Sequence, residues 1–292
     1  MTTSLTTRKE RYNVTTVQTS AERSVRNGDL SDALAHLQED VRVHPDDPKL
    51  RIFLFQLLCV AGQWTRAINQ LGVVAAMDPA AIEMAHPYGD AAACELIRAD
   101  VFAGRTSPMV LGDPEPWLAP LIESLLLAGR GEHGASEQRR VRAFDEAPPS
   151  SGHIDARPFQ WIADADSRLG PVLEAIVNGH YYWVPFARLR RIAIDPPADL
   201  RDIVWISAHL QFDTGDEAMA LIPARYPGSE AAESSIALAR QTVWTEVRSA
   251  VYHGLGQRIL ITDAHEAALL QIRSIELTDG QADATDDSRP GL

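Results

Sequence analysis

Apolar residues in the first half of the chain follow the spacing of amphipathic helices, with one helical face apolar and the other polar. The pattern recurs with one offset, because positions of the same kind repeat together. The matching pairs are Gly28 and Gly62, Leu30 and Trp64, Ala33 and Ala67, Leu37 and Leu71, and Pro45 and Pro79. This period of about 34 residues is typical of tetratricopeptide helical hairpins. Such repeats usually present a surface to another protein, so the pattern favours binding over catalysis.

The repeat is imperfect. Phe55 stands where the consensus has a glycine in its first helix, and the next offset falls on Leu96, where no glycine stands. The spacing returns near the end of this half, between Gly131 and Pro148. We therefore predict a tetratricopeptide-like domain of about four hairpins over residues 19–148.

The pattern changes after residues 147–152, where the sequence Ala-Pro-Pro-Ser-Ser-Gly predicts a linker. Beyond it, short segments rich in Ile, Val, Tyr and Trp alternate with Gly, Pro and Asp, as in strands. The predicted strands cover residues 181–186, 189–194, 202–206, 218–222, 258–262 and 268–275, and the predicted helices cover 171–178 and 229–239. The fold prediction is a multidomain chain in which the helical-hairpin domain precedes a small α+β domain, residues 153–278, with a curved antiparallel sheet.

Charge and composition limit the kind of partner. The chain has 292 residues and 45% apolar content, enough to bury a sizeable core. Its 27 Lys and Arg against 40 Asp and Glu give a net charge of −13. This balance argues against nucleic acid or an anionic membrane as the main ligand. Cys59 and Cys94 lie in apolar helical stretches without metal-ligand spacing, so we expect buried free thiols in a reducing cytosol.

No targeting or membrane-spanning segment is visible in the sequence. Residues 1–18 are polar and Thr-rich, residues 279–292 are polar and acidic, and both are predicted to be disordered tails. The first of these lacks the apolar centre of a signal peptide. The apolar runs are shorter than the roughly 20 residues that span a bilayer. We expect a cytoplasmic protein without a membrane partner.

Asp164 and Asp166 are the candidates for enzyme chemistry, because two carboxylates on one face of a strand could bind a hard cation. Arg168 follows closely, and a guanidinium clamps a carboxylate bidentately without any metal. An ion-pair cluster is therefore favoured over a partner-contact surface, and both over a metal or catalytic site. A second set, which we interpret in the same way, consists of Asp199, Arg201, Asp202 and Arg225.

Other catalytic motifs are missing. The nine histidines show no metal-binding spacing, and neither a phosphate loop nor a nucleophile elbow occurs. The aromatic run of residues 181–183 could stack nucleic-acid bases, but an acidic chain without a basic groove favours core packing instead. We expect no cofactor and no metal.

Several longer stretches resemble one protein family. The segment from Phe159 to Glu174, which contains Trp161, Asp164, Asp166, Arg168 and Gly170, closely resembles the hallmark of the ImpE/TagJ family, accessory proteins of bacterial type VI secretion systems. The other similar stretches are residues 51–58, 62–67, 110–117, 181–186, 199–205, 222–230 and 254–258. The candidate partner-binding or structural residues within the similar stretches are Trp161, Asp164, Asp166, Arg168, Arg201, Asp202, Arg225 and Tyr226.

The resemblance implies a binding role. Members of this family pair a tetratricopeptide-like domain with an α+β domain and associate with TssB, the small subunit of a contractile sheath. The resemblance links them indirectly to the second sheath subunit, TssC, and to the ClpV ATPase that recycles the sheath. We therefore expect a non-enzymatic scaffold that assists sheath assembly or turnover. Two alternatives stay open: an enzyme centred on Asp164 and Asp166, and a general cytosolic adaptor.

Overall fold

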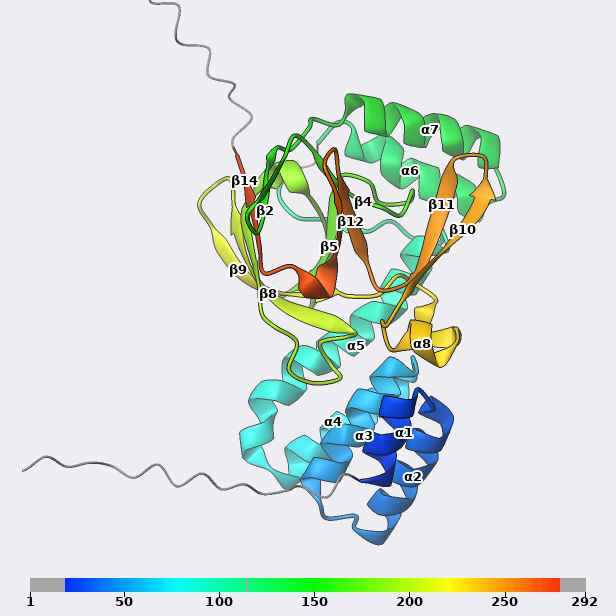
Figure 1. Cartoon of the computed structure of the whole chain (residues 1–292), viewed down its shortest axis with the longest axis vertical. Helices are drawn as coiled ribbons and strands as arrows, with labels where there is room; N and C mark the ends of the chain where they lie inside the picture. Colours follow the sequence, from blue (N-terminus) through cyan, green and yellow to red (C-terminus); the bar gives the residue numbers. More distant parts are fainter. Residues whose placement is uncertain (1–18, 114, 279–292) are drawn as a thin grey trace, which may run out of the picture.

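The computed structural model describes residues 19–113 and 115–278. The predicted disordered tails, residues 1–18 and 279–292, lie outside the described residues. Figure 1 shows a helical body at one end of the molecule and a body of β-sheets at the other. The long helix α5 runs from the first body to the second, and helices α6 and α7 lie beside the sheets.

Side-chain caps mark the starts of the first three helices. Their bounds are α1 Ser20–Asn27, α2 Leu30–Val43, α3 Pro48–Val60, α4 Trp64–Met77, α5 Ile82–Phe102, α6 Leu118–Gly129 and α7 His133–Glu146. Thr19 and Glu22 form a capping box at α1, and the Asp47 side chain accepts hydrogen bonds from the first backbone N–H groups of α3. Gly28 and Gly62, the repeated glycines, have positive φ and provide the turns after α1 and α3.

Within the described residues, three helix pairs pack as hairpins: α1 with α2, α3 with α4, and α6 with α7. The prediction of four hairpins is therefore wrong by one. Helix α5 has no return helix of its own, because the chain turns at Gly104 and enters strand β1, Met109–Val110. Strand β1 pairs with strand β6 of the sheet. In place of a return helix, α5 is therefore followed by a strand of the second body.

The second body contains three sheets over the described residues. A nine-stranded sheet has the order β1-β6-β5-β9-β8-β7-β14-β2-β3, a three-stranded sheet has the order β13-β12-β4, and β10 and β11 form a separate ribbon. The strands are β2 Gly152–Ile154, β3 Arg157–Phe159, β4 Ile162–Asp164, β5 Val172–Val177, β6 His180–Pro185, β7 Leu189–Ile194, β8 Trp205–Phe212, β9 Glu217–Pro223, β10 Thr242–Arg248, β11 Val251–Gly256, β12 Ile259–Thr262, β13 Glu266–Ala268 and β14 Ser274–Leu277. Among the described residues, all strand pairings are antiparallel except that of β1 with β6. The predicted fold class, a tetratricopeptide-like region followed by a sheet domain, is confirmed.

The helix predicted over residues 171–178 is wrong, because this segment is strand β5. All six residues of β5 are buried, so its sequence shows no alternation of apolar and polar positions. Leu173 and Ala175 face a core between the two larger sheets, which we call the sheet core. Val172 and Ile176 face the opposite side and join the core of the helices, which we call the helical core. A strand covered on both faces and a buried helix give similar short apolar runs.

Three further predicted elements differ in extent. The helix expected over residues 229–239 is a 3-10 turn, Ser229–Ala231, followed by the short helix α8, Ser234–Ala237. The strand expected over 202–206 starts only at Trp205, at the beginning of β8. The strand expected over 268–275 is divided by a turn at Leu269–Gln271. In each case the residues between the elements form turns, which apolar spacing alone does not reveal.

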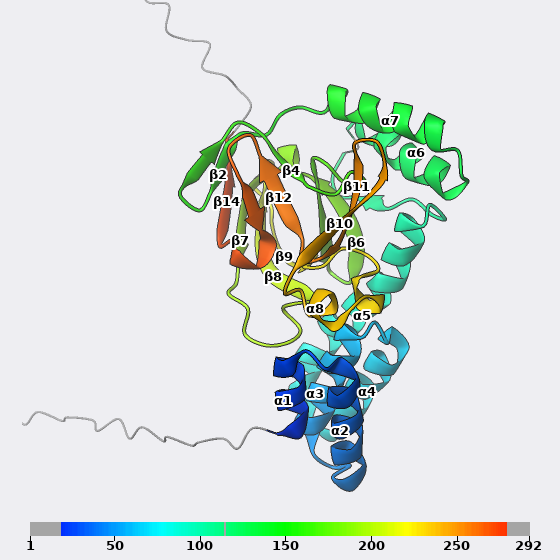
Figure 2. The same cartoon turned by 45° about the vertical axis from the view of Figure 1, so that its right-hand side comes forward.

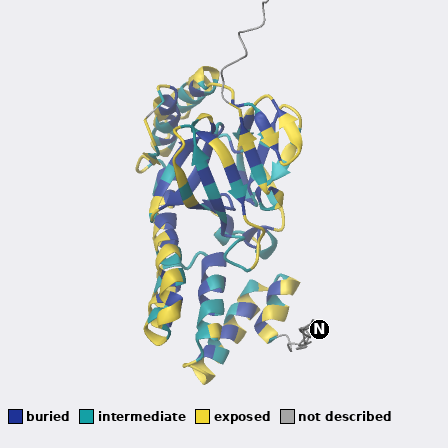
Figure 3. Ribbon diagram, turned by 90° about the vertical axis from the view of Figure 1, so that its left-hand side faces the viewer, coloured by how far each residue is buried: buried dark blue, intermediate teal, exposed yellow. Residues whose placement is uncertain are grey.

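The helical core crosses from one body to the other. It contains residues of α1 to α7 together with Val172, Tyr181, Trp183 and Trp205 from the nine-stranded sheet. On the face of the sheet seen in Figure 3, buried and exposed positions alternate along the strands. The β10–β11 ribbon stands apart from the nine-stranded sheet and lies next to α6 and α7 (Figure 2).

No helix among the described residues is both long and apolar enough to cross a bilayer.

The end of α5 and the end of α6 meet backbone to backbone. A Cβ atom added to Gly129 would lie 2.5 Å from the carbonyl oxygen of Ala103, and one added to Gly104 would lie 2.4 Å from that of Leu125. Neither backbone can move aside without moving its helix. This contact fixes the position of the α6–α7 hairpin against α5.

We predict that Gly129→Ala lowers the free energy of unfolding by about 1–3 kcal/mol, because overpacking displaces backbone. Gly72→Ala is the matched control, since nothing lies within 4 Å of the added Cβ. That control should stabilise α4 by up to about 1 kcal/mol through helix propensity. Urea denaturation measures both, and equal stability changes in the two variants would contradict the close contact.

Candidate functional site

The carboxylate of Asp164 is buried at the end of β4 and is fully engaged in hydrogen bonds. Its Oδ1 accepts hydrogen bonds from the backbone N–H of Asp166 at 2.8 Å and from the Tyr226 hydroxyl at 3.1 Å. Its Oδ2 accepts a hydrogen bond from Nη1 of Arg258 at 2.7 Å. Both oxygens are therefore held by donors from the protein itself.

Asp166 is held in the same way by its own loop. Its Oδ1 accepts hydrogen bonds from the backbone N–H and the Nε of Arg168, at 2.9 and 2.8 Å. Its Oδ2 accepts hydrogen bonds from Nη2 of Arg168 at 2.5 Å and from the backbone N–H of Gly254 at 2.9 Å. The Arg168 guanidinium also lies 4.9 Å from the ring centroid of Phe102 in α5. Asp166 thus ties the loop after β4 to the ribbon, and Arg168 carries the contact on to α5.

A chain of buried charges of alternating sign joins α5 to β4. Its members are Glu95, Arg98, Glu174, Arg258 and Asp164, in that order. Arg98 pairs with Glu95 at 3.2 Å and donates to the Glu174 carboxylate through Nε at 2.6 Å. Arg258 donates from one nitrogen to Glu174 and from another to Asp164. Glu174 and Arg258 have no exposed surface, so the charges rely on one another for solvation.

Aromatic side chains donate further hydrogen bonds to the carboxylates of this charge chain. The Tyr181 hydroxyl donates to the Glu174 carboxylate at 2.6 Å and accepts a hydrogen bond from the Trp183 indole at 2.8 Å. The Trp205 indole donates to Glu95 at 2.8 Å. The run of residues 181–183 therefore contributes Tyr181 and Trp183 to the helical core, as core packing predicts.

The two central carboxyl groups respond oppositely to this environment. Burial acts to raise the pKa of Glu174, but Arg258 and Arg98 outweigh it and hold the pKa at about 2. Burial raises the pKa of Asp164 to about 7, although Arg258 opposes the shift. The difference follows from the number of partners, because two guanidinium groups contact Glu174 and one contacts Asp164.

Arg225 connects the second body to the end of α3. Its Nη1 donates to the carbonyl of Val60 at 2.9 Å and to that of Ala237, and its Nη2 donates to the carbonyl of Cys59 at 3.3 Å. Arg240 does the same at the end of α1, where it donates to the carbonyl of Val25 at 2.7 Å. Helix C-termini carry partial negative charge and free carbonyls, so both contacts are favourable. The turns of the repeat are therefore docking points for the second body.

Arg201 and Asp202 lie in the loop before β8, away from the charge chain. Arg201 pairs with Asp199 at 2.5 Å and its guanidinium lies 4.6 Å from the ring centroid of Tyr88 in α5. Asp202 accepts hydrogen bonds from the backbone N–H groups of residues 198 and 199. Trp161 is 39% exposed and lines a cavity of about 370 Å³ together with Asp164 and Asp166. The candidate residues thus form one buried network, one loop and one surface tryptophan.

All four carboxylate oxygens of Asp164 and Asp166 accept hydrogen bonds from the protein itself. Within residues 19–113 and 115–278, no group of three or more His, Cys, Asp and Glu is arranged to hold a metal ion. Cys59 and Cys94 are buried and free. Burial raises the pKa of Cys94 to about 11, so this thiol stays protonated near neutral pH and is a poor nucleophile.

A groove runs along α1 and α3, where a repeat of this type presents its inner helices. Its volume is about 1070 Å³, and one wall is the loop of residues 197–200. Charges of both signs line it, including those of Glu22, Arg26, Asp47 and Lys49. We call it the helical groove.

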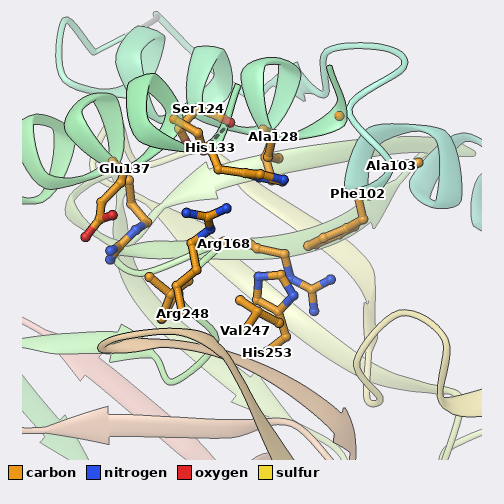
Figure 4. Close-up of a pocket in the computed structure, with 16 residues that line it drawn as sticks. Phe102, Ala103, Ser124, Ala128, His133, Glu137, Arg168, Val247, Arg248 and His253 are labelled. Atoms are coloured by element: carbon orange, nitrogen blue, oxygen red, sulfur yellow. Dashed lines mark hydrogen bonds between the residues drawn. The ribbon is translucent and has the colours of Figure 1, made fainter. Parts of the chain in front are cut away.

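A second cavity, of about 410 Å³, lies between the α6–α7 hairpin and the β10–β11 ribbon. Figure 4 shows Arg168, Arg248 and His253 facing the helices that carry Ala128, His133 and Glu137. Arg140 of α7 completes the basic lining, and Phe102, Ala103, Leu125, Ala128 and Gly129 form an apolar floor. We call it the basic pocket.

The basic pocket has a positive environment on an acidic protein. Burial lowers the pKa of His253 to about 4, and the charges of Arg168 and Arg140 add to this effect while Asp166 opposes it. This pocket was not predicted from the sequence, because the net charge of −13 conceals a local excess of arginine. The local signal was the basic run of Arg139, Arg140 and Arg142 on α7.

Comparison with known proteins identifies relatives over most of the chain. A family model described as ImpE protein matches residues 156–276, and one described as tetratricopeptide repeat matches residues 24–86. The Type VI secretion system accessory component TagJ of Pseudomonas aeruginosa is 48% identical over 257 residues, which cover 88% of this chain and 90% of that protein. The crystal structure of protein VPA1032 from Vibrio parahaemolyticus has a TM-score of 0.82 at 23% identity, covering 89% of this chain and 98% of that one. The last similarity supports the fold alone.

We predict that Glu174→Gln destabilises the protein by about 3–5 kcal/mol, because Arg98 and Arg258 lose the charge that balances them in the core. The matched control is Glu276→Gln on the exposed side of β14, which should change stability by less than about 0.5 kcal/mol. Chemical denaturation measures both. Similar stabilities of the two variants would show that the folded protein does not need the Glu174 charge to balance Arg98 and Arg258.

The same variant changes the response to acid. In the folded protein the Glu174 pKa lies near 2, below its ordinary value of 4.5, so its contribution is present above pH 4.5 and is lost as the pH falls toward 2. Glu174→Gln should lack this part of the acid-induced loss of stability. A pH series of denaturation curves tests it, and parallel acid dependence in wild type and variant would contradict it.

Proposed function

The chain belongs to the ImpE/TagJ family of type VI secretion accessory components, and from this membership we propose that it is a non-enzymatic scaffold that binds the sheath subunit TssB. In this role it assists assembly or turnover of the sheath. The observation that carries the proposal is the 48% identity to a type VI secretion accessory component across nearly the whole length of both chains.

The architecture supports a binding role. Tetratricopeptide repeats are used for protein recognition, and the chain matches such a repeat over residues 24–86. The second body is joined to the repeat by buried ion pairs and by arginines at helix ends. A partner would therefore meet one continuous surface that includes parts of both bodies.

The signature carboxylates support the same proposal over the enzyme alternative. A general base or a metal ligand needs a lone pair that is free to reach substrate or cation. Each oxygen of Asp164 and Asp166 already accepts a hydrogen bond from the protein, and the two residues are only 2% and 0% exposed. Their chemistry is that of an ion-pair network that holds loops in place.

The proposed partner set follows the family. TssB is the direct partner, and TssC and the ClpV ATPase are reached through the sheath. The proposed location is the cytoplasm, where this sheath is assembled. We assign no nucleic acid, membrane or cofactor to the function.

The direct test is a pull-down of purified TssB by the immobilised full-length protein. We expect TssB to be retained, and TssC alone, as the specificity control, to pass through. Absence of TssB binding, together with metal-dependent turnover that Asp166→Ala abolishes, would favour the enzyme alternative. Equal retention of TssB and of unrelated helical proteins would favour the general adaptor.

A further inference from the structure

We propose that the basic pocket binds an acidic, partly apolar polypeptide segment of a protein partner. The inference rests on the proposed function, so the partner tested is TssB. The pocket is built by four elements far apart in sequence: the end of α5, the α6–α7 hairpin, the loop after β4 and the β10–β11 ribbon.

The charge of the pocket specifies an acidic occupant. Arg140, Arg168 and Arg248 line it together with a single carboxylate, that of Glu137. Arg168 is already engaged by Asp166. Arg140 and Arg248 form no ion pair with any described residue, and Arg140 instead lies 5.6 Å from the ring centroid of Phe144. Two guanidinium groups are therefore available to carboxylates, on a chain whose net charge is −13.

The floor of the pocket specifies an apolar group next to the acidic ones. Phe102, Leu125 and Ala128 line it, and the backbone contact between Gly104 and Gly129 brings α5 and α6 close together beneath it. A small anion would leave this apolar surface exposed to water. A side chain such as leucine between acidic residues would cover the floor and still present carboxylates to the arginines.

The ribbon extends the surface beyond the pocket, which favours a polypeptide over a small molecule. Val243, Trp244, Val247 and Tyr252 are exposed on it, and Val247 also lines the pocket. Over the described residues β10 pairs with β11 alone, so its outer edge is unpaired. Exposed apolar side chains next to an open strand edge are typical of partner-binding surfaces.

The helical groove is a weaker candidate for the same partner. Both acidic and basic side chains line it, so it has no charge preference for an acidic segment. It also has the larger volume of the two cavities, about 1070 Å³ against about 410 Å³. Its basic residues Arg26 and Lys49 provide a matched control.

The experiment measures the affinity of purified TssB for the full-length protein and three variants by isothermal titration calorimetry. Arg140→Glu/Arg248→Glu should weaken binding at least tenfold, because it replaces attraction with repulsion. Ala128→Trp, which fills the pocket without changing charge, should weaken it at least tenfold as well. Arg26→Glu/Lys49→Glu, with the same change of net charge in the helical groove, should leave the affinity within twofold.

Several results would overturn the assignment. Wild-type TssB affinity in both pocket variants, with their melting temperatures unchanged, would exclude the basic pocket while leaving the proposed function intact. An equal loss of TssB affinity in the helical-groove variant would show that the effect comes from net charge and not from the basic pocket. A change of oligomeric state on charge reversal would identify a second copy as the occupant, and tighter TssB binding after removal of residues 279–292 would identify that acidic segment. Failure of the wild-type protein to bind TssB would contradict both the proposed function and the assignment of the basic pocket.

Discussion

The paired contacts of Glu174 with Arg98 and Arg258 are the interaction on which the two bodies depend. Glu174 points from β5 to the helical side of the sheet, where Arg98 of α5 reaches it, and Arg258 continues the charge chain to Asp164. These charged residues are at most 4% exposed, so each needs the next for solvation. Such a chain forms only when α5, β5, β4 and the start of β12 are all in place. It therefore selects one arrangement of the bodies, and the arginines at the ends of α1 and α3 reinforce it.

This constraint separates the residues that build the molecule from those that could meet a partner. Asp164, Asp166 and Tyr226 are buried, so their contacts lie within the chain. The surface elements held by that framework are the α6–α7 hairpin and the β10–β11 ribbon. Arg168 connects the buried residues to the surface elements, because it forms an ion pair with Asp166 and also lines the basic pocket. A substitution in the buried network would therefore alter the pocket without touching a partner.

The sequence predicted the features that depend on local spacing. Gly28 and Gly62 marked helix turns, since turn glycines act within a few residues of themselves, and Arg168 was correctly suspected of clamping a nearby carboxylate. Strand β5 was missed because burial on both faces removes the alternation that marks a strand. The partners of Asp164 and Glu174 could not be predicted, because Arg258 and Arg98 lie 94 and 76 positions away along the chain. The basic pocket stayed hidden because its arginines come from three separated segments of an acidic chain.

In the proposed function, a rigid, internally paired framework presents the basic pocket and the ribbon to TssB. Hydrogen–deuterium exchange of the full-length protein, alone and with saturating TssB, tests it most directly, since amide protection reports where a partner covers or stabilises backbone. We expect new protection over residues 133–140 and 242–253, with residues 162–174 equally protected in both states. New protection confined to residues 19–56, or faster exchange at residues 162–174 on binding, would contradict it.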